Sequence, residues 1–468
     1  MGADWIRDGG PASVMDRPTV PPAHDAASRL QSAPTSQATC APTWIGLDLG
    51  TSGCRAVAID AAGERLAEAR ATLPEPHRPA PGWVEQDPEP WWQAALDCLS
   101  RIAQALPRHQ PVAICCDATS ATLLLTDPDG VPLGPALMYD DRRALAQATR
   151  IAAVTPAESP ARGPSASLAK LLHLHDQLDV RAPVLALHQA DWISGRLRGQ
   201  PGASDWNNAL KLGYDAERRA WPAWVETLVP ATVRLPEVHP PGARIGTLTP
   251  ALAARLGWSR RARILAGTTD STAAVIAAGA TMTGDAVTSL GSTLVLKILA
   301  DRPITASALG IYSHRFGERW LVGGASNSGG AVLRRYFSDT EIAMLSQSID
   351  PTHPSGLDYY PLLAPGERFP RNDPGLAPRL DPRPPEPRDF LQGLLEGIAR
   401  IEVEGYARLA ELGAPPPRRI IGIGGGAANP TWRQIRARLL GVPVETATRT
   451  EAADGVALLA LRHTPIEP

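Results

Sequence analysis

The sequence Trp44-Ile-Gly-Leu-Asp-Leu-Gly-Thr-Ser-Gly-Cys-Arg-Ala-Val-Ala-Ile-Asp60 contains two apolar runs separated by a short polar turn. The runs at residues 44–49 and 56–59 predict two β-strands joined by that turn. Gly50, Thr51 and Ser52 leave backbone N–H groups open to an anion, and the two hydroxyls add donors. Asp48 precedes the turn, where its carboxylate is suited to a hydrated divalent cation. We therefore predict a phosphate and metal site here; an ordinary hairpin turn beside an acidic residue is the alternative. The stretch is not a GxxxxGK[ST] loop, because no lysine follows the glycines.

Length and composition limit the class of protein. A chain of 468 residues is too long for one compact core, so two domains are expected, with three as the alternative. The 46 basic and 48 acidic residues nearly balance, which gives no indication of a nucleic-acid partner. The five cysteines form neither a disulfide framework nor a zinc pattern, and no apolar run reaches membrane-spanning length. We expect a cytoplasmic protein. Lysine is scarce relative to arginine, which we attribute to genomic base composition.

The first residues differ from the rest in composition. Residues 1–42 are rich in Pro, Ala, Ser and Thr and lack both apolar periodicity and the apolar core of a signal peptide. We expect a disordered leader there, or a start codon placed too early. The predicted domains are residues 43–284 and residues 285–468.

The segments after the opening hairpin predict a ribonuclease-H-like α/β unit. A third strand follows, then a helix at about residues 91–106 and a buried strand at residues 112–116. Asp117, Thr119 and Ser120 stand at the end of that strand, where open α/β sheets place ligands. Two further segments, residues 189–194 and 204–215, are predicted as polar and aromatic loops. Their tryptophans suit the faces of a sugar, or else they fill spaces between helices.

A strand from Arg263 leads through a glycine turn into a helix of small residues that begins near Asp270. The helix dipole stabilises a carboxylate at that position. We therefore expect the Asp270 carboxylate to stay ionised, and a simple helix cap is the alternative.

The opening hairpin has a second copy later in the sequence. Leu290-Gly-Ser-Thr, within the apolar stretch 286–299, resembles Leu49-Gly-Thr-Ser. A strong helix is expected at residues 388–412, and Arg419-Ile-Ile-Gly-Ile-Gly-Gly-Gly-Ala-Ala-Asn429 predicts a strand, a glycine turn and a helix. The fold class is therefore α/β, with two ribonuclease-H-like domains and a cleft between them. Two such hairpins can grip a polyphosphate, and closure of the cleft would exclude water.

With these motifs the chain resembles the FGGY carbohydrate kinases, which share the actin, Hsp70 and sugar-kinase fold. The resemblance covers about residues 44–461. Its most specific strings are Gly46-Leu-Asp-Leu-Gly-Thr-Ser-Gly, Gly267-Thr-Thr-Asp-Ser, Leu290-Gly-Ser-Thr and Gly424-Gly-Gly-Ala-Ala-Asn. Within the family it is most similar to the xylulokinase-like D-ribulose kinases, through Asp117-Ala-Thr-Ser-Ala-Thr, Gln189-Ala-Asp-Trp, Asp205-Trp-Asn-Asn-Ala-Leu-Lys-Leu-Gly-Tyr, Ala325-Ser-Asn-Ser-Gly-Gly and Gly356-Leu-Asp-Tyr-Tyr-Pro-Leu.

The resemblance implies that residues 43–284 carry the sugar site, the first phosphate loop and the catalytic residue, and that residues 285–468 carry the ATP site. It also implies a role for individual residues. Asp270 would be the catalytic base and contact the sugar. Asp48 would serve the metal and the sugar, and Ser120 and Asp141 would contact the sugar. The implied ATP-binding residues are Gly50, Thr51, Ser52, Gly291, Ser292, Thr293, Gly424, Gly425, Gly426 and Asn429. Two departures from the family pattern are Ala428, where members often carry Lys or Arg, and Tyr139-Asp140 in the sugar-binding string.

We expect ATP and Mg²⁺ as cofactors and phosphorylation of the terminal hydroxyl of a keto-pentose, with D-ribulose ahead of D-xylulose. Partners other than small molecules are not expected, and the oligomeric state is left open. The alternatives are a kinase for a polyol or hexulose, and an ATP-binding relative without catalysis. An intact Asp270 together with both phosphate turns favours catalysis.

Overall fold

The computed structural model describes residues 40–465. The predicted leader lies outside the described residues, except that strand β1 already begins at Ala41. Within the described part of the chain, no helix has the length and apolar character needed to cross a membrane.

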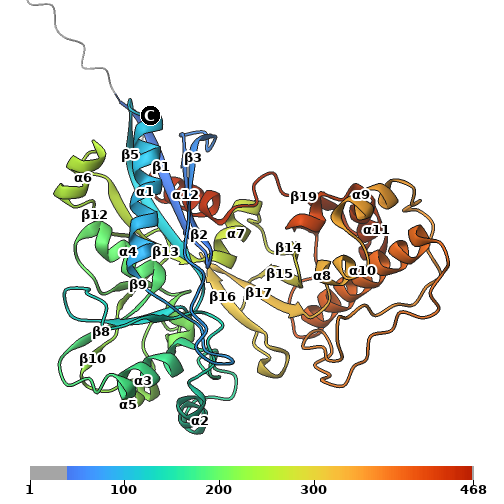
Figure 1. The fold of residues 1–468 in the computed structure, drawn as a ribbon, viewed down its shortest axis with the longest axis horizontal. Coiled ribbons are helices and arrows are strands. Elements are labelled where there is room, and N and C mark those ends of the chain that lie inside the picture. Colours follow the sequence, from blue (N-terminus) through green and yellow to red (C-terminus); the bar gives the residue numbers. More distant parts are fainter. Residues whose placement is uncertain (1–39, 466–468) are drawn as a thin grey trace, which may run out of the picture. The chain divides into compact units, whose positions relative to one another are not determined.

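The first sheet has the strand order β12-β13-β5-β1-β2-β3 (Figure 1). Its strands are β1 (Ala41–Leu49), β2 (Gly53–Ile59), β3 (Arg65–Thr72), β5 (His109–Ala118), β12 (Arg244–Thr247) and β13 (Arg263–Thr269). β1 pairs antiparallel with β2 and parallel with β5, and β5 is parallel to β13. The predicted start of a ribonuclease-H-like unit, with three strands, a helix and a fourth strand, is confirmed. A short strand, β4 (Glu85–Gln86), is inserted before the helix.

Helices cover both faces of this sheet. Leu47 and Leu49 of β1 belong to the apolar core under α1 (Glu89–Ala105), whereas Trp44 belongs to the core beside α7 (Asp270–Ala278) and α12 (Ala452–His463). This division follows from the alternation of side chains along a strand. Gly46 faces α12, where an added Cβ would lie 2.0 Å from the carbonyl oxygen of Ala453. The last helix of the chain therefore packs directly on the first strand.

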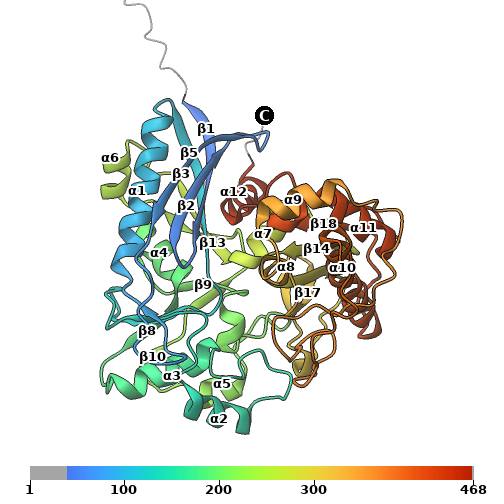
Figure 2. The same ribbon diagram turned by 45° about the vertical axis from the view of Figure 1, so that its right-hand side comes forward.

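The second sheet repeats the first. Its order is β16-β17-β15-β14-β18-β19, with β14 (Asp285–Leu290), β15 (Leu294–Ala300), β16 (Tyr312–Phe316), β17 (Arg319–Ser326), β18 (Arg419–Ile423) and β19 (Val444–Thr446). The hairpin β14–β15 corresponds to β1–β2, and β14 pairs parallel with β18 as β1 does with β5. Figure 2 shows α10 (Pro387–Glu411) beside this sheet, close to the predicted helix 388–412. The two-domain α/β fold is confirmed.

A third sheet, β10-β8-β6-β7-β4, is inserted into the first half. Its further strands are β6 (Leu123–Thr126), β7 (Ala136–Leu137), β8 (Val184–His188) and β10 (Val233–Arg234), and β9 (Ala203–Asp205) pairs separately with β11 (Glu237–His239). The remaining helices are α2 (Leu145–Val154), α3 (Ser167–Gln177), α4 (Gln189–Arg198), η1 (Ala209–Leu212), α5 (Ala223–Leu228), α6 (Pro250–Leu256), η2 (Ser307–Leu309), α8 (Gly330–Arg334), α9 (Asp339–Gln347), η3 (Gly425–Ala428) and α11 (Pro430–Leu440).

One predicted loop is a helix. Residues 189–194 form the buried start of α4, because the Asp191 carboxylate accepts a hydrogen bond from the His188 backbone N–H at 3.0 Å and starts the helix. Trp192 is 1 % exposed and meets Trp91 edge-on at 6.2 Å. Trp206 is 5 % exposed. Both tryptophans therefore fill packing space, which was the alternative to a sugar-stacking role.

Candidate functional site

Three carboxylic acids come together at one edge of the first sheet. Asp48 on β1 lies directly opposite Asp117 on β5, and Asp117 in turn lies opposite Thr268 on β13. Asp270 follows two residues later as the first residue of α7. Since β1, β5 and β13 are parallel neighbours, their carboxyl ends share this edge, which is where open α/β sheets bind ligands.

Burial weakens the acidity of all three groups. It raises the pKa of Asp48 to about 6, and the neighbouring Asp117 side chain partly opposes this shift. The pKa of Asp117 is raised well above its usual value, first by burial and then by the charges of Asp48 and Asp270. Asp117 is fully buried, and no group in residues 40–465 donates a hydrogen bond to either of its carboxylate oxygens. The facing pair Asp48 and Asp117 therefore holds a proton readily, or attracts a cation.

This donor set fits Mg²⁺. The ion is usually held by one or two carboxylates and completes its shell with water and phosphate oxygens. Asp48 and Asp117 supply two such carboxylates. No three acidic, histidine or cysteine side chains within residues 40–465 form a cluster that encloses a metal. A cation here would therefore depend on water and phosphate oxygens for its remaining ligands.

Asp270 is held by the first turn of its helix. One carboxylate oxygen accepts a hydrogen bond from the Ser271 backbone N–H at 2.6 Å. Burial raises the pKa of Asp270, whereas that hydrogen bond, Lys297 and Lys211 lower it in that order. A carboxylate whose pKa is raised by burial is a better proton acceptor than one in water. This arrangement suits a general base.

The two remaining predicted sugar residues differ in their surroundings. Ser120 is half-buried and lies two residues beyond the end of β5. Asp141 is fully buried, and its carboxylate accepts hydrogen bonds from the Val84 N–H at 2.6 Å and from Arg143 Nε at 2.8 Å. The Arg143 guanidinium lies 4.3 Å from the ring centre of Trp83. These two hydrogen bonds reach one oxygen of Asp141, and the Arg143 backbone N–H donates to the other at 3.1 Å, so both oxygens are engaged. Direct contact of Asp141 with a sugar stays a prediction, and its hydrogen bonds fix the segment that carries Trp83.

The first of the two turns predicted to bind phosphate lies next to Asp48. The Gly50 N–H donates to the Gly53 carbonyl at 2.9 Å and closes the turn between β1 and β2. Gly50 and Ser52 line a small cavity together with Asp48 and Arg55. Thr51 is half-buried, and its carbonyl accepts a hydrogen bond from Gln86 at 3.1 Å. Asp48 and the first turn therefore share one cavity, and the predicted binding of phosphate and metal there stays a prediction.

The second turn and the glycine turn lie side by side in the other half. The turn formed by Gly291, Ser292 and Thr293 joins β14 to β15, and the N–H groups of Gly330 and Ala331 donate to the carbonyls of Gly291 and Ser292 at 2.9 and 3.1 Å. An added Cβ on Gly424 would lie 3.3 Å from the Gly291 nitrogen. No hydrogen bond within the described residues joins these turns to the first one.

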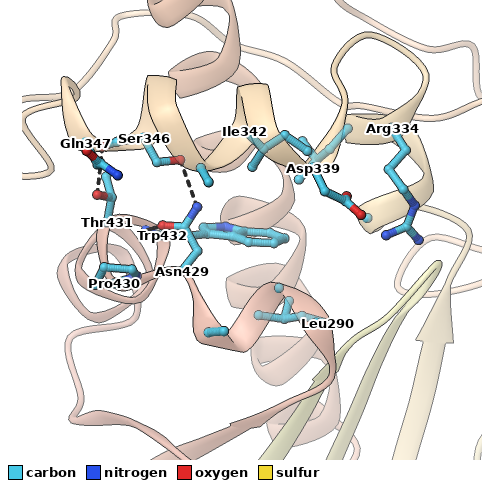
Figure 3. A pocket seen from close by; sticks show the side chains of 16 residues that line it. Leu290, Arg334, Asp339, Ile342, Ser346, Gln347, Asn429, Pro430, Thr431 and Trp432 are labelled. Atoms are coloured by element: carbon cyan, nitrogen blue, oxygen red, sulfur yellow. Dashed lines mark hydrogen bonds between the residues drawn. The ribbon is translucent and has the colours of Figure 1, made fainter.

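An apolar cavity of about 460 Å³ adjoins the glycine turn (Figure 3). Its wall includes Gly425, Gly426 and Trp432 on one side and Ile342 of α9 on the other. Asn429 accepts a hydrogen bond from the Trp432 N–H at 3.0 Å and donates to the Ser346 hydroxyl at 2.8 Å. The largely apolar space with a glycine turn at its edge fits a purine nucleotide.

Sequence reasoning missed three residues of the site. Asp117 was placed at a strand end but received no role, because its pairing with Asp48 depends on strand register. Arg334 lines the apolar cavity and donates to the Ser292 hydroxyl at 3.3 Å; no sequence motif marks it. Lys297 lies on β15, and its charge lowers the pKa of Asp270. The scarcity of lysine was the signal that could have drawn attention to it.

Comparison with known proteins places this geometry in context. Models of the N-terminal and C-terminal domains of the FGGY family of carbohydrate kinases match residues 43–277 and 286–463. Xylulose kinase of Escherichia coli K12 is 27 % identical over 445 residues, which cover 90 % of this chain and 89 % of that protein. Glycerol kinase of Gloeobacter violaceus is 29 % identical over 438 residues, which cover 86 % of this chain and 84 % of that protein.

Solved structures show the same fold. The xylulose kinase of Rhodospirillum rubrum superposes with a TM-score of 0.78 at 23 % identity and covers 89 % of each chain. Glycerol kinase of Plasmodium falciparum, solved with ADP, gives a TM-score of 0.80 at 16 % identity and covers 92 % of this chain and 90 % of its own.

Proposed function

The chain belongs to the FGGY family of carbohydrate kinases, and we propose that it transfers the γ-phosphoryl group of ATP to the terminal hydroxyl of a keto-pentose, D-ribulose before D-xylulose. The observation that carries this proposal is the convergence of Asp48, Asp117 and Asp270 at the carboxyl ends of neighbouring strands, with a phosphate turn beside Asp48.

In the proposed reaction Asp270 accepts the proton of the terminal sugar hydroxyl. The hydroxyl oxygen forms a bond to the γ-phosphorus, the bond to the β,γ-bridging oxygen breaks, and ADP leaves. The Ser271 N–H and the lysine charges keep Asp270 able to ionise inside a buried site. Mg²⁺, when bound by Asp48 and Asp117, neutralises phosphate charge.

The nucleotide is assigned to the apolar cavity. Gly425, Gly426 and Asn429 would line the adenosine, and the turn containing Gly291, Ser292 and Thr293 would hold phosphates. Arg334 lines the apolar cavity and also donates a hydrogen bond to Ser292 in the turn assigned to the phosphates. We infer that Arg334 supplies the cationic contact to the nucleotide that the methyl group of Ala428 cannot make.

We place D-ribulose first because the string Asp117-Ala-Thr-Ser-Ala-Thr resembles that of D-ribulose kinases. The string contains the half-buried Ser120, three residues after Asp117. D-Xylulose is the second candidate, since several relatives are xylulose kinases. The two sugars are epimers at C3. A site built to bond one hydroxyl discriminates strongly against a substrate that does not present it.

Release of ADP from Mg-ATP tests the proposal. Purified protein is assayed with D-ribulose, D-xylulose, L-ribulose, ribitol and glycerol, beside the variant Asp270→Ala. The expected result is the largest kcat/KM with D-ribulose and loss of activity in the variant. A larger kcat/KM with D-xylulose would show that D-xylulose is the preferred substrate. Full activity of Asp270→Ala would refute the role of Asp270 as the base. No sugar-dependent release of ADP would favour a non-catalytic ATP-binding protein.

A further inference from the structure

Lysine is confined to three positions of the sequence, Lys170, Lys211 and Lys297, and arginine supplies the rest of the 46 basic residues. None of the three lysines is exposed: Lys170 is fully buried and the other two are half-buried. An arginine stays charged everywhere, whereas a lysine presents a compact charge that responds to its surroundings. The positions at which this chain keeps lysine are therefore informative.

Lys297 extends from the second sheet to the helix that carries Asp270. It lies on β15, four residues after the second phosphate turn, and its Nζ donates a hydrogen bond to the backbone carbonyl of Ser271 at 2.9 Å. The strand next to it leaves room for this side chain, because a Cβ added to Gly323 would lie 2.9 Å from Lys297 Cγ. The two halves of the chain are thus joined at the first turn of α7.

We propose that Lys297 is a positioning residue for phosphoryl transfer: through Ser271 it fixes the first turn of α7, and through its charge it maintains the ionised form of Asp270. The inference rests on the proposed function, in which Asp270 is the base. Loss of Lys297 would leave the Ser271 carbonyl without this partner and remove one of the two cations beside Asp270.

The charged groups around Asp270 determine in which direction the loss of Lys297 shifts the pKa of Asp270. Asp48 and Asp117 face it from β1 and β5, Tyr139 lies within its field, and Lys211 approaches from η1. His314 on β16 lies near both lysines, which with burial lower its pKa well below the usual value, so it stays neutral. Lys297 and Lys211 are therefore the cations that lower the pKa of Asp270, and Lys297 ranks first.

The coupling is reciprocal and can be measured on Lys297 itself. Burial lowers the pKa of Lys297 to about 8, and the charge of Asp270 acts in the opposite direction. Replacing Asp270 by Asn removes that support, so the pKa of Lys297 should fall further. Lys170 is an internal control, because the charges acting on it are Asp141, Lys211, Asp140 and Arg143 and do not include Asp270.

Nuclear magnetic resonance of protein labelled with [13Cε]lysine provides the test. The sequence yields three lysine signals, which single Lys→Arg variants assign. We expect the Lys297 titration to move to lower pH in Asp270→Asn while that of Lys170 stays in place. An unchanged Lys297 titration would overturn the proposal, and so would an equal shift of Lys170. This measurement needs no catalysis, so its failure is distinct from failure of the kinase assignment.

The pH profile of the reaction gives the second test. In Lys297→Met the pKa of Asp270 should rise, which moves the acidic limb of kcat/KM to higher pH and lowers kcat at least ten-fold at neutral pH, with a smaller change in KM. Lys297→Arg should restore the position of that limb. Arg319→Met is the matched control, because Arg319 lies on neighbouring β17 and donates to Thr283 at 3.1 Å rather than to α7. An acidic limb in Lys297→Met that coincides with that of the parent would refute the charge role.

Discussion

Gly425 and Gly426 are adjacent and line the same apolar cavity, yet a methyl group on each should have opposite consequences. A Cβ on Gly425 meets no atom within 4 Å, and the residue is not in the left-handed region. Gly425→Ala should therefore fold normally and gain up to about 1 kcal/mol from lower entropy of the unfolded chain. A Cβ on Gly426 would lie 2.5 Å from the Trp432 ring and 2.9 Å from Leu290 Cβ.

Trp432 has little freedom to move aside. It is 1 % exposed, and its indole N–H donates to the Leu395 carbonyl at 3.0 Å. Overpacking of this kind costs about 1–3 kcal/mol, so Gly426→Ala should lower the free energy of unfolding by that amount. Because Gly425 lines the cavity, the extra methyl of Gly425→Ala should instead reduce the space for the nucleotide. Misfit by one carbon costs about 1–3 kcal/mol in binding, or roughly 10- to 200-fold.

Two measurements on each variant separate these effects. Urea denaturation reports the free energy of unfolding, and isothermal titration reports the Kd of ATP. We expect Gly425→Ala to keep its stability, to bind ATP at least ten-fold more weakly and to retain the KM of the sugar. Gly134→Ala, a substitution that also meets nothing within 4 Å but lies outside this cavity, is the control. Parent-like ATP binding by Gly425→Ala would refute the nucleotide assignment, and a stability loss equal to that of Gly426→Ala would refute the packing argument.

Four further substitutions test the rest of the structure. Asp270→Asn should lower kcat by about 10²–10⁴-fold with an unchanged melting temperature, measured by ADP release and calorimetry. Gly46→Ala should cost at least about 3 kcal/mol in urea denaturation, because its Cβ would overlap the Ala453 carbonyl. Asp141→Asn should cost about 1.5–3 kcal/mol in the same assay, since it removes one of the two carboxylates that pair with the buried Arg143 guanidinium and leaves only Glu85. Burial lowers the pKa of Lys170 to about 7, so the unfolded chain binds more protons between that pH and about 10 and stability rises with pH there; Lys170→Met should lack this rise between pH 7 and 9.

The repeated hairpins were predictable because they rest on local signals. Leu49-Gly-Thr-Ser and Leu290-Gly-Ser-Thr each place a glycine turn between apolar strands, and both form the expected hairpin. The start of α7 at Asp270 was equally local, since a strand, a glycine and a run of small residues mark it. Helix α10 was predicted within a residue at each end because its apolar face has a long, regular period.

Long-range pairing was beyond the sequence. Asp117 faces Asp48 only because β5 lies parallel to β1 in one particular register, and no local pattern encodes that register. Helix α4 was predicted as a loop because Gln189, Asp191 and Ser194 are polar, yet all three are buried where α4 packs on β5 and β13 of the first sheet. Asp141 looked like a sugar ligand from its motif, and only the positions of Val84 and Arg143 reveal that both its oxygens are engaged.

The buried carboxylates explain why the site depends on its ligands. The folded pKa of Asp48 is about 6 against 3.8 in an unfolded chain, so the stability that this group contributes is complete below pH 3.8 and is lost as the pH rises through 6. Two pH units correspond to about 3 kcal/mol at neutral pH. Asp117 adds to this cost in the same direction, because its pKa is raised further. A cation between Asp48 and Asp117 would offset the repulsion between their negative charges. At Asp270 the charge of Lys297, which belongs to the protein itself, stabilises the carboxylate. The site thus divides its negative charge into one carboxylate stabilised by the protein itself and a pair whose charge is balanced only when a metal and phosphate bind.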